Sequence, residues 1–319
     1  MADARRAIKN LLDSHGATLP TPSHFLVAVS GGADSLALAW AAQFVLTNAG
    51  HTLDAVVVDH GLQDGSAEIA AQAGQTLAEL GVAARVVRVE VGTEGGFEHA
   101  AREARYNALR AVAEETSAQA VLLGHTMDDQ AETVILGLAR GSGPSSISGM
   151  AQVSDLWWRP FLSLRRETTR QVCVDAGISW WDDPHNTDDR FLRPRVRHRV
   201  LDVMESELGP GVVEALSATA ELVRADDDYL DALAAETLVG HEGDISAGKL
   251  AVDALQGVAS PIASRILRAA ITRFAGVGLH RVHTDEVLAL VVNWHGQGPI
   301  DIPGVSVERV DNYLVFHRH

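Results

Sequence analysis

Short apolar runs that alternate with longer helical patterns are the feature that most limits how this chain can fold. Such runs are typical of buried parallel strands, because helices cover both faces of the sheet, and the alternation indicates βαβ units. We therefore expect an α/β fold with a doubly wound, mostly parallel five-stranded sheet. Strands are expected at Phe25–Ser30, Leu53–Asp59, Arg85–Val91, Ala120–Gly124 and Leu156–Phe161. Helices are expected near Ser35–Thr47, Ser66–Leu80, Glu98–Glu115, Asp128–Arg140 and Glu167–Ala176.

The pattern changes after about Leu201, where helical segments follow one another without intervening strands. Near the C-terminus, short alternating segments appear at Ile300–Ile302, Val305–Arg309 and Tyr313–His317. A length of 319 residues accords with two domains of ordinary size. We expect an α/β catalytic domain over residues 1–200 and a mainly helical C-terminal domain over residues 201–319.

The composition excludes several classes of site. The single cysteine, Cys173, excludes an internal disulfide and any metal cage built from cysteines alone. Only Lys9 and Lys249 are lysines, so a Schiff base or a phosphate-binding lysine is not expected. The sequence has no run of 18 apolar residues, and its first ten residues lack the apolar core of a signal peptide. We therefore expect a soluble cytoplasmic protein without a membrane partner; a homodimer is left open.

Charge is distributed unevenly along the chain. The formal net charge is −16, which argues against nonspecific binding to nucleic acid. The segment from Asp202 to Asp244 holds twelve acidic residues and one arginine, whereas Arg190–Arg199, the arginine strip, holds five arginines and no acid. One interpretation is a directed contact with a polyanion, in which Arg193, Arg195 and Arg197 bind phosphates. The alternative is an ordinary solvated charged face.

A glycine-rich turn between the first expected strand and helix indicates a phosphate site. Two glycines let the backbone approach a ligand, and the start of the helix offers unpaired N–H groups. Ser30 and Ser35 add hydroxyl donors, and Asp34 is a candidate ligand for Mg²⁺. The alternative is a tight turn whose polar residues cap the helix. The candidate nucleotide-binding residues of this turn are Ser30, Gly31, Gly32, Ala33, Asp34 and Ser35.

Further polar residues follow the second and fourth expected strands. The carboxyl ends of parallel strands meet where ligands bind, so Val58, His60, Gly124 and His125 are expected near the nucleotide. The backbone around Val58 is expected to contact the adenine edge. His125 is a candidate for contact with the phosphates or with the acceptor base. The alternative is a loop position in which its side chain faces solvent.

Two charged helices supply the remaining candidates. Asp129 and Glu132 are three residues apart, so both carboxylates share a helical face and suit an ammonium group. The alternative is helix capping, because Thr126 and Asp129 have the spacing of a capping box. Arg102 and Arg105 also share a face, and they contact either phosphate or RNA, or pair with glutamates of their own helix.

The motifs occur in one collinear order over residues 25–200. They are Ser30-Gly-Gly-Ala-Asp-Ser35, Val58-Asp-His-Gly-Leu62, Ala101-Arg-Glu-Ala-Arg-Tyr106, Gly124-His-Thr-Met-Asp-Asp-Gln-Ala-Glu-Thr133, Arg140-Gly-Ser-Gly143, Arg159-Pro160, Asp183-Pro-His-Asn186 and Phe191-Leu-Arg-Pro-Arg-Val-Arg197. The first resembles the SGGxDS signature of the PP-loop ATP pyrophosphatases, and the set resembles the tRNA(Ile)-lysidine synthases among them. Two residues depart from that pattern: Gln63 stands where arginine is usual, and Pro194 replaces an asparagine.

The resemblance implies a ligase that uses ATP and Mg²⁺ to join free L-lysine to the wobble cytidine of isoleucine tRNA with a CAU anticodon. An adenylated cytidine is the implied intermediate, and AMP and pyrophosphate are released. It implies catalytic roles for Asp34, Asp129, Glu132 and Arg197, with Asp34 on the metal. Substrate-binding roles are expected for Arg102, Arg105, Asp129, Glu132, Arg193, Arg195 and Arg197. The alternatives are another PP-loop amidating ligase of the NAD-synthetase kind and a non-enzymatic nucleotide- or RNA-binding module; the lone cysteine disfavours a tRNA thiolase.

Overall fold

The computed structural model describes the whole chain except residues 17–18, 62–64, 93–95, 142, 185–187 and 189. The chain forms two compact units. The first comprises Met1–Leu136 and Gly149–Ala218, and the second comprises Gly137–Ser148 and Thr219–His319. In the described part of the chain, no helix is long and apolar enough to cross a membrane.

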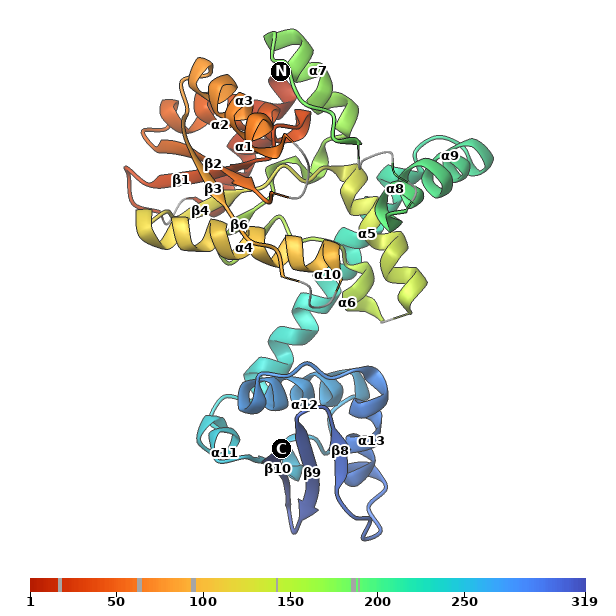
Figure 1. Cartoon of the computed structure of the whole chain (residues 1–319). Coiled ribbons are helices and arrows are strands. Elements are labelled where there is room, and N and C mark those ends of the chain that lie inside the picture. The colour runs from red at the N-terminus through yellow and green to blue at the C-terminus, as the bar shows by residue number, and fades with distance from the viewer. Residues whose placement is uncertain (17–18, 62–64, 93–95, 142, 185–187, 189) are drawn as a thin grey trace. The chain divides into compact units, whose positions relative to one another are not determined.

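A mixed sheet forms the centre of the first unit (Figure 1). Its strand order within the described residues is β3-β2-β1-β4-β6-β5, in which all neighbours run parallel except the pair β5 and β6. The strands are β1 (His24–Val29), β2 (Thr52–Asp59), β3 (Ala83–Arg88), β4 (Ala120–Leu122), β5 (Val153–Ser154) and β6 (Trp157–Trp158). From β1 the chain continues to β2 and β3 on one side of the sheet, and β4 then lies on the other side of β1. The strand order therefore reverses between β1 and β4, which is the switch point where such folds bind ligands.

Helices cover both faces of this sheet, as the apolar strands require. Along β1, Phe25 and Val27 pack into one apolar cluster with α1, α2, α3 and α7, whereas Leu26 packs with α4 on the opposite face. Side chains alternate in this way because successive residues of a strand point to opposite faces. The helices of this unit are α1 (Ala2–His15), α2 (Ala33–Asn48), α3 (Ser66–Glu79), α4 (Phe97–Thr116), α5 (Met127–Arg140), α7 (Arg166–Ala176), α8 (Leu192–Arg195) and α9 (Asp202–Leu208), with the 3₁₀ turn η1 (Pro160–Ser163) and the π-helical turn η3 (Val196–Leu201).

The expected fold class is confirmed, with some differences in detail. The described sheet has one strand more than the five expected, because β5 pairs antiparallel to β6 at the edge. The two-residue strand β5 is too short to show an apolar alternation in sequence. The N-terminal helix α1 is a second element that was not predicted from the sequence, although Ala4, Ile8 and Leu11 form its buried face.

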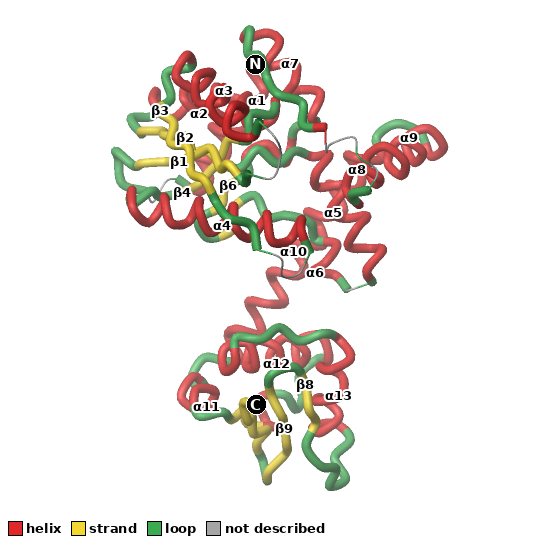
Figure 2. The backbone as a smooth tube through the Cα atoms, viewed as in Figure 1, coloured by secondary structure: helices red, strands yellow, loops and turns green. Residues whose placement is uncertain are grey.

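The second unit packs helices on an antiparallel sheet of order β7-β10-β9-β8 (Figure 2). Its last three strands correspond to the alternating segments seen in the sequence, while β7 was not expected. The helices and strands are α6 (Pro144–Ile147), α10 (Val212–Thr237), α11 (Glu242–Ser246), β7 (Lys249–Ala251), η4 (Val252–Ala254), α12 (Ser260–Ala275), α13 (Arg281–Val292), β8 (Ile300–Ile302), β9 (Val305–Val310) and β10 (Tyr313–Arg318). Two helices belong to both units: α5 ends in the second unit, and α10 begins in the first. Its core includes Ile266, Leu290 and Leu314, which are fully buried.

Candidate active site

The turn between β1 and α2 has the geometry of an anion cradle. Gly31 has a φ of +85°, which L side chains rarely adopt, and Gly32 is the N-cap of α2. The Ser35 hydroxyl donates to the Gly32 carbonyl at 2.9 Å and accepts from the Ser30 N–H at 3.2 Å. These bonds hold the turn open toward a cavity of about 1030 Å³, and the first N–H groups of the helix are available for an anion.

Gly124 brings the end of β4 against this turn. A Cβ atom at Gly124 would lie 3.2 Å from the carbonyl of Asp34 and from Cα of Ser35, which are backbone atoms that cannot rotate away. The absence of a side chain therefore lets the segment after β4 approach the start of α2. The predicted nucleotide-binding residues that line the cavity are Ser30, Gly32, Ala33, Asp34, Ser35, Val58, His60, Gly124 and His125; Gly31 shapes the turn without lining it.

Two neutral imidazoles and a buried guanidinium form another wall of the cavity. Burial lowers the pKa of His125 to about 3, and burial together with Arg105 lowers the pKa of His60. Burial also lowers the pKa of Arg105 from its usual value. Nδ1 of both histidines and Nε of Arg105 lack a hydrogen-bond partner among the described residues. Buried polar atoms are rarely left unpaired, so this wall is suited to a polar ligand.

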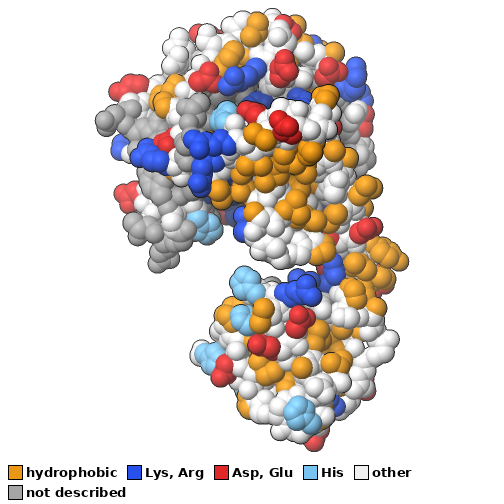
Figure 3. Space-filling model, turned by 90° about the vertical axis from the view of Figure 1, so that its right-hand side faces the viewer, with side chains coloured by type: hydrophobic (Ala, Val, Ile, Leu, Met, Phe, Trp, Pro, Cys, Tyr) orange, Lys and Arg blue, Asp and Glu red, His pale blue; other side chains and the backbone are white. Residues whose placement is uncertain are grey.

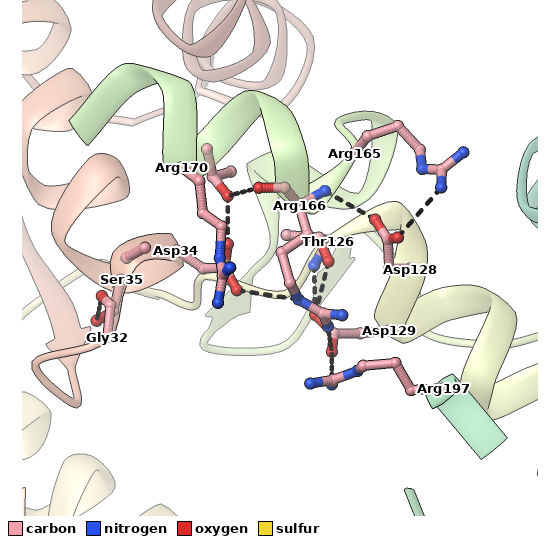
Figure 4. A network of polar contacts seen from close by, with 12 residues as sticks. Gly32, Asp34, Ser35, Thr126, Asp128, Asp129, Arg165, Arg166, Arg170 and Arg197 are labelled. Atoms are coloured by element: carbon pink, nitrogen blue, oxygen red, sulfur yellow. Dashed lines mark hydrogen bonds and ion pairs between the residues drawn. The ribbon is translucent and has the colours of Figure 1, made fainter. Parts of the chain in front are cut away.

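Asp129 both caps the start of α5 and lines the cavity. One of its carboxylate oxygens accepts hydrogen bonds from the backbone and hydroxyl of Thr126, at 2.7 and 2.9 Å, so the capping interpretation is realised. The other oxygen accepts from Nη2 of Arg166 at 2.6 Å, and Asp129 also lines the cavity (Figure 4). Burial raises the pKa of Asp129, but Arg166, His125 and the Thr126 hydrogen bond lower it overall. The carboxylate is therefore charged at neutral pH.

Glu132 lies behind Asp129 and is completely buried. Its Oε1 accepts a hydrogen bond from Nε of Arg197 at 2.7 Å and lies 3.5 Å from Nη1 of Arg166. Its Oε2 has no hydrogen-bond partner among the described residues. Arg197 lies in η3 and lines the cavity, whereas Glu132 does not. The two predicted carboxylates are therefore close together, but only Asp129 faces the cavity.

Arg166 is a site residue that was not predicted from the sequence. Its side chain is 16% exposed and lies among Asp34, Asp129 and Glu132. Although burial lowers the pKa of this guanidinium, the three carboxylates raise it overall. A sequence signal existed, because Arg165 and Arg166 stand at the N-terminus of α7, where the helix dipole disfavours positive charge. Two arginines in that position indicate nearby acids.

Asp34 connects the phosphate turn to α7. Its Oδ1 accepts a hydrogen bond from the hydroxyl of Thr169, and its Oδ2 lies 3.5 Å from Nε of Arg166. Burial raises the pKa of Asp34, although the bonds to Thr169 and Arg166 act in the opposite direction. A cation beside Asp34 would stabilise its charged form.

The members of the arginine strip differ in their contacts and exposure. Arg190 pairs with Asp188, which lies just outside the strip, and Arg197 pairs with Glu132. Arg195 is exposed and Arg193 is half-buried. Pro194 lies in the first turn of α8, where its missing N–H costs no helical hydrogen bond.

The arginines of α4 contact an aromatic ring. Arg102 donates to the Tyr106 hydroxyl at 3.1 Å, and both Arg102 and Arg105 lie over the Tyr106 ring. Glu103, one of the glutamates considered as their partner, pairs instead with His99. The remaining positions singled out in the sequence, namely Leu62, Gln63, Ser142, His185 and Asn186, lie outside the described residues.

The chain is similar to known proteins over nearly its whole length. A PP-loop domain model matches residues 2–204, and a TilS substrate binding domain model matches residues 250–315. A tRNA(Ile)-lysidine synthase from Leifsonia xyli is 51% identical over 315 residues, covering 96% of this chain and 94% of the relative. One from Streptomyces coelicolor is 47% identical over 297 residues, covering 91% of this chain and 84% of the relative. The fold also resembles a U34-tRNA thiolase from Methanococcus maripaludis, with a TM-score of 0.59, 17% identity and coverage of 70% of this chain and 79% of that one.

Proposed function

The chain belongs to the tRNA(Ile)-lysidine synthase family of PP-loop ligases, and from that premise we propose which groups carry each step. The reaction joins free lysine to the wobble cytidine of isoleucine tRNA with a CAU anticodon, with ATP as the activating substrate. The observation that supports this assignment best is the meeting of the anion cradle and the Asp129 carboxylate of α5 in one cavity. Because these are substrates of the translation apparatus, the cytoplasm is the proposed location.

ATP is placed with its phosphates at the start of α2. The helix N-terminus and the hydroxyls of Ser30 and Ser35 supply hydrogen bonds to the phosphate oxygens. The backbone near Val58, at the end of β2, and the imidazole of His60, just after β2, form the wall for the adenine, because both line the same cavity. This orientation directs the α-phosphate toward the end of β4.

Asp34 is the proposed protein ligand of Mg²⁺. No group of three or more His, Cys, Asp or Glu side chains gathers as a metal site in the described residues. A single carboxylate beside a phosphate cradle nevertheless fits Mg²⁺, which usually keeps several waters and binds one or two carboxylates together with substrate phosphates. The ion would neutralise charge on the phosphates. Because burial raises the pKa of Asp34, a cation there would also relieve an unfavourable buried charge.

In the first step the cytosine carbonyl oxygen attacks the α-phosphate and pyrophosphate leaves, which gives an adenylated base. The chain contributes by positioning and by electrostatic stabilisation of the developing charge. The unpaired Nδ1 atoms of His60 and His125 and Nε of Arg105 are the polar groups available to the base and to the transferred phosphate.

In the second step the ε-amine of lysine attacks the activated ring carbon and AMP leaves. The amine arrives as an ammonium with an ordinary pKa of ~10.4 and must lose a proton before it attacks. The Asp129 carboxylate is charged and lines the cavity, and we assign to it the attraction of the ammonium. Glu132 supports this contact from behind by fixing Arg197.

Transfer RNA is proposed to bind where arginines are accessible. Figure 3 shows Lys and Arg side chains gathered on one face of the first unit, although the chain as a whole is acidic. Arg102 and Arg195 are exposed and Arg193 is half-buried, so all three are accessible to phosphates. The match of residues 250–315 to a substrate binding domain model supports a further tRNA contact in the second unit.

The test is pyrophosphate release from ATP with tRNA and lysine added singly and together. We expect release to require the CAU-anticodon tRNA, and AMP formation to require lysine as well. An amidating ligase acting on a small acid would release pyrophosphate without tRNA, and a binding module would release none. Asp34→Asn should keep the fold, measured by circular dichroism, and abolish the release. Near-normal turnover of this variant in saturating Mg²⁺ would contradict the metal assignment.

A further inference from the structure

We propose that Arg166 is a positioning residue that ties the nucleotide end of the cavity to its amine end. Its guanidinium lies between Asp34 of α2 and Asp129 of α5 (Figure 4). It is also paired with Glu132 of α5. The inference rests on the proposed function, which gives Asp34 to the metal and Asp129 to lysine. It assigns to Arg166 a role in both half-reactions.

The guanidinium of Arg166 forms an ion pair with each of the three carboxylates. Nη2 is 2.6 Å from Oδ1 of Asp129, whereas Nε and Nη1 are each 3.5 Å from an oxygen of Asp34 and of Glu132. Arginine is suited to this position because its planar fork presents donors in fixed directions. The side chain is largely buried, so its charge is poorly screened by solvent and its contacts are strong.

The start of α7 does not need this guanidinium for its own stability. The backbone N–H of Arg166 donates to Oδ2 of Asp128 at 2.7 Å, and the hydroxyl of Thr169 donates to Asp34. These bonds attach the first turn of α7 to α5 and α2 without using the Arg166 side chain. A positive charge at a helix N-terminus is itself unfavourable. The guanidinium is therefore explained by the carboxylates around it rather than by its helix.

The ion pairs of the cluster reach its two ends unequally. Three carboxylates, Asp34, Asp129 and Glu132, face two arginines, Arg166 and Arg197. Among the residues that the structure describes, the ion pairs of Arg197 reach only Asp129 and Glu132, at 3.8 and 2.7 Å. In the described part of the chain, Arg166 is the arginine whose ion pairs reach both ends.

The chain offers a matched control beside Arg166. Arg165 pairs with Asp128 at 3.4 Å and with Glu214 at 2.7 Å, and Figure 4 shows its side chain directed away from Asp34. Arg165→Met therefore removes an arginine and its ion pairs from the same helix terminus without touching the three carboxylates. Arg166→Met removes the charge under test, and Arg166→Lys keeps the charge while losing the fork.

Three quantities are measured for each variant. They are the single-turnover rate of tRNA adenylation without lysine, and the kcat and lysine KM of the complete reaction. For Arg166→Met we expect adenylation slowed about tenfold or more, equivalent to ~1.4 kcal/mol or more, and a lysine KM raised about tenfold. Arg166→Lys should recover part of both losses. Arg165→Met should stay within about twofold of the wild type in all three quantities.

A merely structural role for Arg166 would lower the active fraction and leave the lysine KM unchanged, which would overturn the proposal. Loss of only one half-reaction, or equal losses in the Arg165 and Arg166 variants, would overturn it as well. If Arg166→Met does not fold, Arg166→Lys decides, because it must still slow adenylation and raise the lysine KM. Failure of the wild type to release pyrophosphate with tRNA would instead refute the proposed function.

Discussion

Asp129→Asn should separate lysine binding from adenylation. The substitution is nearly isosteric and keeps one oxygen that can accept from Thr126, but it removes the charge that faces the cavity. A hydrogen bond between ions contributes roughly 1.5–3 kcal/mol, and each ~1.4 kcal/mol corresponds to a tenfold change in affinity. We therefore expect the lysine KM to rise roughly ten- to a hundredfold.

The capping role of Asp129 requires a control, and Thr126→Val supplies it. Thr126 is completely buried, and valine removes the hydroxyl that donates to Asp129 at 2.9 Å while it keeps the backbone N–H. Loss of a hydrogen bond to a charged group costs roughly 1.5–3 kcal/mol, and each kcal/mol lowers the melting temperature of a domain this size by roughly 2–4 °C. The Thr126 variant should show that shift with an unchanged lysine KM.

The assay pairs adenylated-tRNA formation in the absence of lysine with lysidine formation over a lysine titration. Adenylation by Asp129→Asn should fall much less than its apparent lysine affinity, because cytidine activation involves no amine. If the variant keeps its lysine KM and loses only thermal stability, as Thr126→Val should, then Asp129 is a helix cap and the ammonium binds elsewhere.

Three further variants test other parts of the site. Gly124→Ala should raise the KM for ATP about tenfold or more in steady-state assays, because its Cβ would press on the backbone of Asp34; an unchanged KM would contradict this packing. Alanine at Arg193 and Arg195 should weaken tRNA binding and reduce its salt slope by about 0.7–0.9 for each phosphate that the variant no longer binds; an unaltered slope in filter-binding titrations would exclude both. The pKa of His125 is depressed to about 3 by burial, so its neutral form stabilises the fold above pH 6.5, and that contribution is lost as the pH falls from 6.5 toward 3. His125→Gln should therefore flatten the fall of unfolding free energy between those values in urea titrations, and an unflattened curve would place its imidazole in solvent.

Much of the first unit follows from local sequence. The apolar run from Phe25 to Val29 and the turn Gly31-Gly32 predict a strand, a tight turn and a helix start, because each depends on neighbouring residues only. The motif order then indicates the family, which the comparisons support. Strand ends and helix starts are correct to within a few residues, whereas the two-residue strand β5 was not expected.

The polar contacts of the site were not predictable in the same way. Asp129 and Glu132 were expected to share a helical face open to lysine, yet Glu132 is completely buried behind Arg197. Arg197 reaches Glu132 from a π-helical turn, η3, and no apolar periodicity indicates such a turn. The spacing of two residues in a helix shows that they share a face. It does not show which other segments pack on that face.

The reactive groups, and their position after the strands of a parallel sheet, can be read from the chain alone, because apolar strand runs and turn residues depend on neighbouring residues. The pairing of those groups depends instead on how distant helices pack. Arg166 is more than 100 residues from Asp34 in sequence, but α7 packs against α2 and brings its guanidinium to 3.5 Å from that carboxylate. A buried charge is stable only beside a partner, and the partner of each charge in this site comes from another part of the chain.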